Sequence, residues 1–168
     1  TFICLLGGDF SPRLNNLPIR MNSVIEVKKG DLLLFGKRKF GARVYLAVKG
    51  GVQTEKILNS RSFFSGITPK IKLEKGDLLQ IKPKSKTLFP NYSRIKIKEQ
   101  RYLSLCLDCY KGPEFEELNT EQKKTLLRCF TISEDNNRVG YRLKEVVENN
   151  LNPILTSSVL PGTVQLTP

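Results

Sequence analysis

Short stretches in which apolar and polar residues alternate run through most of this chain, and they predict a mainly β protein. The clearest strand is expected at residues 42–48, ended by the glycine pair 50–51. Residues 1–6 form another expected strand, ended by the glycine pair 7–8. Such patterns are typical of strands that bury one face, and glycine pairs interrupt them. We expect both segments to belong to a β scaffold.

Later segments are expected to add further strands and a short helix. Strands are expected around Ile95, at 102–107 and, after a Pro-Gly turn, at 164–166. In each of these segments β-branched, aromatic or leucine residues occupy alternate positions. A short helix is expected at 143–148.

One longer helix has a recognisable start. Asn119 is a good N-cap residue, and Gln122 follows three positions later, which is the spacing of a capping box. The basic side chains that follow are expected to face solvent. The apolar face of this helix is expected to comprise Leu126, Leu127 and Phe130.

An internal repeat supports the β interpretation. The segment 25–33 (Ile-Glu-Val-Lys-Lys-Gly-Asp-Leu-Leu) returns as 71–79 (Ile-Lys-Leu-Glu-Lys-Gly-Asp-Leu-Leu). Each copy predicts a short strand, a Lys-Gly-Asp turn whose glycine takes a positive φ, and an apolar strand. Either turn alone is ordinary turn chemistry. Two copies in matching context favour a barrel or sandwich built from related hairpins.

The net charge is +12, from 28 Lys and Arg against 16 Asp and Glu, which raises the question of a nucleic-acid partner. The basic residues are scattered, however. Arg94, Lys96 and Lys98 alternate with isoleucines, as on a half-buried strand with a wet face or on a basic stripe that faces a ligand. Because no aromatic-basic platform accompanies them, we expect no nucleic-acid partner. No apolar run approaches the ~20 residues of a spanning helix, so we expect no membrane association.

The chain has no histidine, which removes the usual general base at neutral pH and the commonest transition-metal ligand. Cys106 and Cys109 have the spacing of a redox or zinc pair, but no second pair completes a tetrahedral site. In the strand expected there, the two thiols would point to opposite faces. Free cysteine is also a common core residue. We therefore expect no metal centre and a cytoplasmic protein with reduced thiols.

A change in composition divides the chain. Residues 83–93, rich in Lys, Pro and Ser, are expected to link a first β subdomain at 1–82 to a second one, with one helix, at 94–168. A polar loop follows the first expected strand. Its partner-facing candidates are Asp9, Asn15 and Asn16.

The segment 133–143 concentrates amides, two guanidiniums and a phenol, planar donors that suit carboxylate, amide or phosphate groups. The run 161–166 adds a hydroxyl and an amide after its Pro-Gly turn. An arginine in a Ser-Arg-Ser loop of the first part either binds an oxyanion or ties its loop to backbone carbonyls. Polar turns on a β scaffold are the alternative for the other two segments. The substrate-binding candidates are Arg61, Arg138, Tyr141, Arg142, Thr163 and Gln165, and no catalytic residue is identified.

Several short motifs occur here in one order. They are Gly8-Asp9, Gly41-x-Arg43-x-Tyr45-Leu46-Ala47-Val48-x-Gly50-Gly51, Leu58-x-Ser60-Arg61-Ser62, Lys75-Gly76-Asp77, Gly112-Pro113, Asn137-Arg138-x-Gly140-Tyr141-x-Leu143 and Pro161-Gly162-Thr163-Val164-Gln165. The series resembles the KipA family, also called allophanate hydrolase subunit two, the biotin-dependent carboxyltransferase-like family that includes one of the 5-oxoprolinase subunits. The likeness runs from about residue 2 to the end.

The resemblance implies a mainly β protein with a few short helices and a cyclophilin-like β-barrel architecture in two subdomains. It implies a subunit of an ATP-dependent 5-oxoprolinase, a hydrolase that opens 5-oxoproline to glutamate. The enzyme would be active only as a complex with a KipI-like subunit and a third subunit. ATP would bind at the level of that complex, because no Gly-x-Gly-x-x-Gly or Walker loop is present. Biotin use is left open, since no Ala-Met-Lys-Met-like carrier signal occurs.

Under this interpretation Arg138, Arg142 and Gln165, with Arg61, would line a cleft for the lactam or carboxylate of a small acid. Such donors act by positioning and electrostatics rather than by proton transfer. The alternatives are a regulatory protein that binds and antagonises a KipI-like kinase inhibitor, or a carboxyltransferase-type subunit acting on a urea-like substrate.

Three departures from the family pattern matter. The usual N-terminal segment is absent, and so are a further strand and a Thr-Thr-Gly-Gly-Tyr-Pro motif after the last matched run, so we expect the chain to be a fragment that lacks its C-terminal part. The frequent Asp before the first focal arginine is Asn137 here. This removes an ion-pair partner for Arg138.

Overall fold

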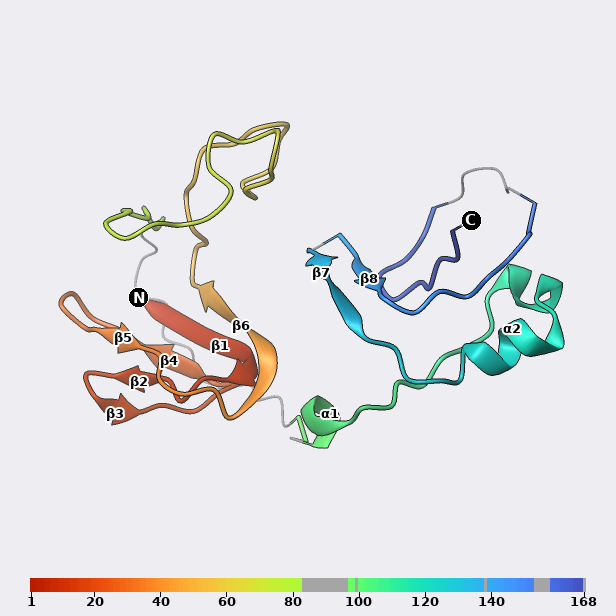
Figure 1. The fold of residues 1–168 in the computed structure, drawn as a ribbon. Coiled ribbons are helices and arrows are strands. Elements are labelled where there is room, and N and C mark those ends of the chain that lie inside the picture. The colour runs from red at the N-terminus through yellow and green to blue at the C-terminus, as the bar shows by residue number, and fades with distance from the viewer. Residues whose placement is uncertain (83–96, 99, 138, 153–157, 168) are drawn as a thin grey trace. The chain divides into compact units, whose positions relative to one another are not determined.

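The computed structural model describes residues 1–82, 97–98, 100–137, 139–152 and 158–167 (Figure 1). These residues form short strands with a few short helices, so the expected mainly β class is confirmed. The strands that they contribute make open sheets of three, three and two strands rather than a closed barrel. The cyclophilin-like architecture stays a prediction. In chain order the elements are β1 (Phe2–Asp9), β2 (Arg13–Leu14), β3 (Leu17–Pro18), β4 (Val24–Glu26), β5 (Leu33–Leu34), β6 (Phe40–Val48), α1 (Gln100–Leu103), the 3-10 helix η1 (Pro113–Glu117), α2 (Thr120–Thr125), β7 (Ile132–Asn136) and β8 (Tyr141–Leu143).

The chain divides into two compact units, Thr1–Leu107 and Asp108–Pro168. The first contains β1 to β6 and α1, and the second contains η1, α2, β7 and β8. The linker expected at 83–93 lies outside the described residues, so the subdomain limits proposed from composition stay predictions. Among the described residues, every helix is too short to cross a membrane.

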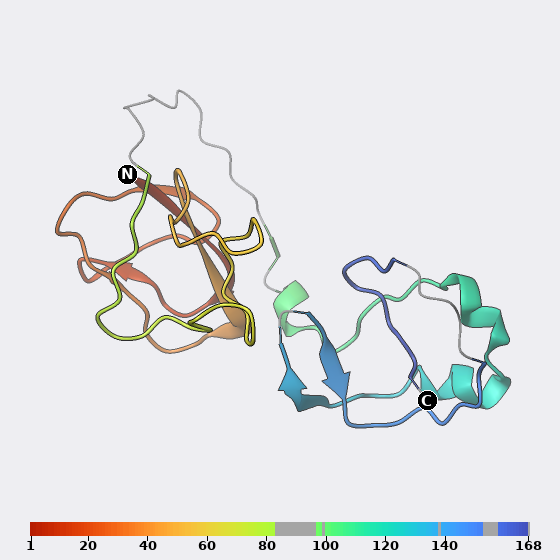
Figure 2. The same ribbon diagram turned by 90° about the horizontal axis from the view of Figure 1, so that it is seen from above.

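The main sheet of the first unit has the order β4-β1-β6, with β1 in the middle and antiparallel to both neighbours. Leu5 of β1 is fully buried and Ile3 is 7% exposed, which places the core of this unit against one face of β1. The strand expected at 42–48 lies within β6, and Gly51 follows it in a turn closed by a hydrogen bond from its N–H to the carbonyl of Val48. Figures 1 and 2 show β1 and β6 side by side.

The strand expected at 1–6 is longer than the sequence indicated, because β1 continues through its glycine pair. A Cβ on Gly7 would lie 2.5 Å from the carbonyl oxygen of Arg43, and one on Gly41 would lie 2.5 Å from the Cα of Gly8. The strand register shifts between Gly7 and Asp9, at this close approach. The glycines therefore do not end the strand; they let two backbones meet at a bulge.

The two Lys-Gly-Asp turns adopt the same geometry. In the first, the Asp31 N–H donates to the carbonyl of Lys28 (3.2 Å), and the Asp31 carboxylate accepts from the Lys28 N–H (2.8 Å). In the second, Asp77 makes the matching bonds with Glu74, at 3.1 and 2.9 Å. Gly30 and Gly76 have φ values of 91° and 94°. The predicted positive φ is confirmed in both copies.

The prediction of a strand on each side of the second Lys-Gly-Asp turn is wrong. The first copy is flanked by β4 and β5. The second copy, residues 71–79, forms no strand, and an isolated bridge between Val52 and Ile81 follows it. A strand needs a neighbour to satisfy its backbone groups, and the sequence repeat does not supply one.

Other expected elements are also corrected. Residues 102–107 begin in α1, where the Tyr102 ring packs on Phe40 with centroids 5.3 Å apart, so tertiary packing overrides the alternation. The short helix expected at 143–148 is absent, because Leu143 belongs to β8 and the Lys144 N–H donates to the carbonyl of Thr131. No strand forms at 164–166, and the one expected around Ile95 lies largely outside the described residues.

In the second unit, the predicted start of α2 is confirmed. The Asn119 side chain accepts from the Gln122 N–H (2.9 Å), and the Gln122 side chain accepts from the Asn119 N–H (2.8 Å). The helix ends at Thr125, however, so the apolar residues expected on its face lie beyond it, and Leu127 is 87% exposed. The buried apolar residues described in this unit are Leu118 and Val147.

The close approach of β1 and β6 yields a stability test. Gly41→Ala is expected to lower the free energy of unfolding by about 2–4 kcal/mol, because positive-φ strain adds to a backbone clash. Gly76→Ala is the matched control, since Gly76 also has a positive φ but no heavy atom lies within 4 Å of its Cβ position. It should lose only about 1–2 kcal/mol. Urea unfolding followed by circular dichroism measures both, and equal losses would contradict the clash.

Candidate functional site

The polar segment expected to form the site is a hairpin in the second unit. β7 and β8 pair antiparallel, with Ile132 opposite Leu143 and Asn136 opposite Tyr141. The turn between the strands is organised by Asn137. Its N–H donates to the carbonyl of Gly140 (3.0 Å), and its amide oxygen accepts from the N–H groups of Val139 (2.7 Å) and Gly140 (3.2 Å). This side-chain acceptor is what an Asx turn requires.

This geometry changes what we expect from the presence of Asn137 where the family frequently has aspartate. The sequence suggested that replacing aspartate by asparagine removes an ion-pair partner for Arg138. The acceptor oxygen of residue 137, however, is engaged with backbone N–H groups, which an amide serves as well as a carboxylate. Arg138 itself lies outside the described residues, so its contribution stays a prediction.

The base of the hairpin is closed by a residue that sequence reasoning missed. The Glu145 carboxylate accepts from the backbone N–H of Thr131 (2.5 Å) and from the Thr131 hydroxyl (2.7 Å). These hydrogen bonds, the backbone one first, lower the pKa of Glu145 below its ordinary value. Glu145 is therefore an ionised clamp at neutral pH. No local signal identifies it, because its partner lies 14 residues earlier in the chain.

Two predicted donors lie on β8. Tyr141 is 55% exposed and Arg142 is also exposed. Since successive side chains of a strand point to opposite faces, Tyr141 and Arg142 present their donors on opposite sides of the hairpin. One small ligand on one face of the ribbon can engage only one of them.

The remaining candidates of the second unit follow the Pro161-Gly162 turn. The Thr163 hydroxyl donates to the carbonyl of Leu160 (2.8 Å), and the Thr163 N–H donates to the same oxygen (3.0 Å). Thr163 thus closes its own turn, while Gln165 lies exposed beyond it. The Asn149 amide donates to the carbonyl of Thr167 (3.1 Å), which ties the terminal run to the segment after β8.

Arg61 lies in the first unit, in the described loop between β6 and α1. Its guanidinium donates to the carbonyl of Thr54, and the Thr54 hydroxyl donates back to the carbonyl of Arg61 (2.8 Å). This is the loop-tying arrangement that the sequence left open beside oxyanion binding. A guanidinium has five N–H donors, so binding of a substrate carboxylate by Arg61 stays a prediction.

The three partner-facing candidates also support turns of the first unit. The Asp9 carboxylate accepts from the Ser11 N–H (2.7 Å) and pairs with Lys39 (3.1 Å). The Asn15 amide donates to Asp31 (2.8 Å) and accepts from the Leu32 N–H (2.9 Å). Asn16 has a φ of 66° in the tight turn between β2 and β3. A partner-facing role for these residues stays a prediction.

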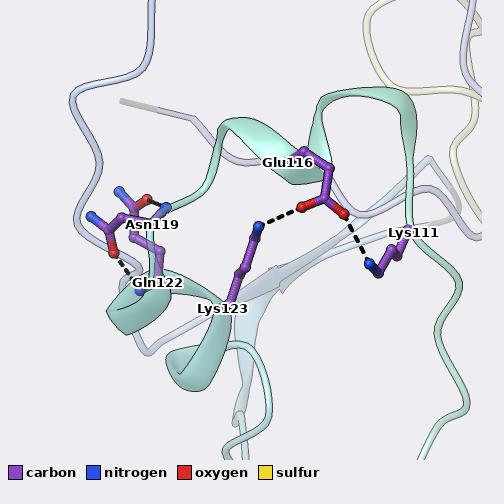
Figure 3. A network of polar contacts seen from close by, with 5 residues as sticks. All are labelled: Lys111, Glu116, Asn119, Gln122 and Lys123. Atoms are coloured by element: carbon purple, nitrogen blue, oxygen red, sulfur yellow. Dashed lines mark hydrogen bonds and ion pairs between the residues drawn. The ribbon is translucent and has the colours of Figure 1, made fainter.

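The carboxylate with the largest pKa shift is Glu116 of η1. Lys111 (2.8 Å) and Lys123 (2.7 Å) both pair with it, and they lower its pKa from 4.5 to about 2 (Figure 3). Both ammonium groups also lie over the Phe115 ring, 5.2 and 5.0 Å from its centroid. A carboxylate with this pKa stays ionised at neutral pH and cannot act as a general acid. The cluster is a clasp between η1 and α2.

The cysteines lie in a different setting from the one expected. Cys106 and Cys109 are exposed thiols in a segment without strand structure, so the argument that a strand points them to opposite faces does not hold. Within the described ranges, no three Cys, Asp or Glu side chains gather as a metal site would require. The second unit offers neutral and cationic hydrogen-bond donors on β8 and after the terminal turn, beside the exposed carboxylates of Glu134 and Asp135 on β7.

Comparison with known proteins gives consistent matches. The sequence model of the family described as "Carboxyltransferase domain, subdomain A and B" matches residues 1–168. The 5-oxoprolinase subunit designated C of Escherichia coli (strain K12) is 27% identical over 173 residues, covering 98% of this chain and 54% of that protein. Urea amidolyases of Lachancea kluyveri and Saccharomyces cerevisiae are 43% and 37% identical over 65 residues, 39% of this chain and 4% of each enzyme. The chain thus spans about half the length of the bacterial relative and much less of the yeast enzymes.

The Asn137 turn can be tested by substitution. Asn137→Ala is expected to lower the free energy of unfolding by about 1–2 kcal/mol, because two backbone N–H groups lose their acceptor. Asn137→Asp keeps an acceptor oxygen and should stay within about 0.5 kcal/mol of the wild type. Urea titration of both variants checks this. Equal stability of the alanine and aspartate variants would show that the side chain does not hold the turn.

The Glu116 clasp predicts a dependence on pH. Because folding lowers the pKa of Glu116, its ionised form favours the folded state above pH 4.5, and that contribution is lost as the pH falls toward 2. Titration by NMR should give Glu116 a pKa of about 2, which rises in Lys123→Gln. Lys124→Gln is the control, since Lys124 pairs with Glu121 (3.0 Å). An unchanged pKa in Lys123→Gln would disprove the clasp.

Proposed function

The chain belongs to the family of carboxyltransferase domains, subdomains A and B, and from this membership we propose that it is a subunit of an ATP-dependent 5-oxoprolinase. The observation that carries the proposal is the similarity to the bacterial 5-oxoprolinase subunit over 98% of the chain. The complex would hydrolyse the lactam of 5-oxoproline to glutamate. Within it, the chain would act with a KipI-like subunit and a third subunit in the cytoplasm.

The chemistry that this chain can contribute is donation of hydrogen bonds. Opening a lactam builds negative charge on the carbonyl oxygen, and fixed donors stabilise that charge. Arg142 and Gln165 are exposed donors of the second unit, and Arg138 belongs to the same hairpin by sequence. Thr163 would support them, Tyr141 would take the place of Arg142 for a ligand on the other side of the hairpin, and Arg61 remains a candidate from the first unit. Because the chain has no histidine, proton transfer would fall to another acid–base group or to water.

ATP would enter at the level of the complex, and biotin use stays open. The sequence holds no phosphate-binding loop, and the donors of the hairpin suit a small acid as well as a phosphate. We therefore place ATP binding at the level of the complex without assigning it to one subunit. Hydrolysis of a lactam does not itself require biotin, and the proposal leaves its use open.

A second substrate class is favoured by a separate observation. The 65-residue matches to urea amidolyase have higher identity than the full-length match, 43% and 37% against 27%. A urea-derived acid is planar and carries amide and carboxylate groups, which the same donors would bind. The alternative function is therefore a carboxyltransferase-type subunit that acts on a urea-like substrate.

Turnover by the assembled complex tests the proposal. The full-length protein would be co-expressed with its KipI-like and third subunits, and ATP-dependent release of glutamate from 5-oxoproline would be measured. Arg138→Ala and Gln165→Ala are expected to lower kcat/KM by about 10²-fold or more, as loss of a donor to developing charge does. Lys124→Gln is the control and should keep wild-type activity.

Two outcomes count against the proposal. An assembled wild-type complex without glutamate release, but with ATP hydrolysis stimulated by a urea-derived acid, would replace it by the alternative substrate. Full activity of both alanine variants would show that the hairpin and the terminal run are not part of the active site.

A further inference from the structure

An irregular segment follows β8 in the second unit and is held at several points; we call residues 144–149 the anchor segment. At its start, the Lys144 N–H donates to the carbonyl of Thr131 (2.9 Å). The Glu145 carboxylate accepts from the Thr131 N–H (2.5 Å) and from the Thr131 hydroxyl (2.7 Å). Val147, near its middle, is 8% exposed. These contacts fix the anchor segment beside the start of β7, although it is neither helix nor strand.

The second half of the anchor segment is bound to α2. The Gln122 side chain, whose oxygen completes the capping box of α2 (Figure 3), donates through its nitrogen to the carbonyl of Glu148 (3.1 Å). The Asn149 side-chain nitrogen donates to the carbonyl of Val147 (3.2 Å). Carbonyl groups outside a ladder need donors, and side-chain amides supply them here. The anchor segment therefore connects the hairpin with the start of the helix.

The terminal run, whose described residues are 158–167, is joined to this frame by a single hydrogen bond. The Asn149 side-chain nitrogen donates to the carbonyl of Thr167 (3.1 Å), 18 residues later in the chain. The hydrogen bonds that Thr163 makes to the carbonyl of Leu160 are internal to the run. Among the residues that the structure describes, no other hydrogen bond or ion pair links the run to the rest of the second unit.

The place of Gln165 therefore depends on Asn149. Gln165 is exposed and lies two residues before Thr167, so its own side chain does not fix its position. A donor stabilises developing charge only when its position is set before the reaction. The anchor segment begins directly after Leu143, the last residue of β8, which also carries Arg142. The bond from Asn149 is thus the shortest connection between the donors of β8 and those of the terminal run.

We propose that Asn149 is a positioning residue of the 5-oxoproline site: its bond to the Thr167 carbonyl holds the terminal run on the anchor segment and keeps Gln165 in a fixed place relative to Arg142. The inference rests on the proposed function for the role of these two donors. Asn149 acts through Gln165 and needs no contact with the substrate. The role requires an N–H donor, because the group that it binds is a carbonyl oxygen.

This role differs from a general contribution to stability. The bond between Asn149 and Thr167 is exposed to solvent, and one neutral hydrogen bond of this kind contributes little to the free energy of unfolding. The buried residues Leu118 and Val147 do not depend on it for their burial in the frame. Loss of the bond should therefore leave the unit folded but release the terminal run. The effect on activity should exceed the effect on stability.

The kinetic test uses the full-length protein in complex with its KipI-like and third subunits. Asn149→Asp keeps the size of the side chain but replaces the donor by an acceptor, and it is expected to lower kcat/KM for glutamate release at least tenfold. Asn150→Asp is the matched control, because it adds the same charge at an adjacent exposed position; its kcat/KM should change less than threefold. In the Gln165→Ala background, Asn149→Asp should cost less than a further twofold, since both changes remove the same contribution.

A second measurement does not depend on activity. Heteronuclear NOE values of the backbone amides at 163–167, recorded on the full-length protein, report motion of the terminal run on the picosecond to nanosecond scale. They should fall in Asn149→Asp and stay at wild-type values in Asn150→Asp. Urea unfolding should show both variants folded, with midpoints close to that of the wild type.

Unchanged NOE values in Asn149→Asp would overturn the inference, whatever the activity. So would wild-type kcat/KM in that variant, an equal loss in Asn150→Asp, or an undiminished further loss in the Gln165→Ala background. The proposed function can fail separately. Lowered NOE values together with an assembled wild-type complex that releases no glutamate would reject the 5-oxoprolinase and keep Asn149 as the anchor of the run. Loss of activity in Gln165→Ala with full activity in Asn149→Asp would do the reverse.

Discussion

The backbone contact between β1 and β6 is the constraint on which the first unit depends. Gly7, Gly8 and Gly41 meet where added Cβ atoms would lie 2.5–2.8 Å from backbone atoms of the opposite strand. This contact fixes the bulge after Gly7 and the register that sets Leu5 beside Leu46. The register in turn decides which side chains are buried, because a shift by one residue would exchange the two faces of the sheet. The burial of Ile3 and Leu5 on one side of β1 is therefore a result of this contact.

Polar residues that attract attention in the sequence are largely used to hold turns. Asn15, Asn137 and Thr163 each satisfy backbone groups of their own loops, and Arg61 ties its loop to Thr54. Short loops leave backbone N–H and C=O groups without ladder partners, and these side chains provide the missing ones. The proposed site would therefore use the exposed donors that remain on the hairpin and after the terminal turn, rather than every polar residue noted in the sequence.

Local features were predictable from the sequence, and features set by distant contacts were not. The capping box at Asn119 and both Lys-Gly-Asp turns are decided within four residues, and the sequence identified them. The strand expected at 102–107 failed because Tyr102 packs on Phe40, far away in the chain. The clamp between Glu145 and Thr131 was missed for the same reason. The candidate site divides in the same way. Its residue types were evident from composition, but the pairing of β7 with β8 was not predicted, and strand alternation separates Tyr141 from Arg142, which the sequence had grouped. The joint use of Arg61 with residues of the second unit stays a prediction.

The long separation between β1 and β6 has a consequence for biosynthesis. Leu5 pairs with Leu46, 41 residues later. At about 5–20 residues per second, β1 waits about 2–8 s on the ribosome before its partner residues on β6 are made, although β4 is available earlier. During that interval β1 can pair only with β4, so the main sheet is incomplete beside Leu5, while turns closed over three residues can already form within microseconds. The N-terminal strand is thus the part of the nascent chain most in need of protection from aggregation.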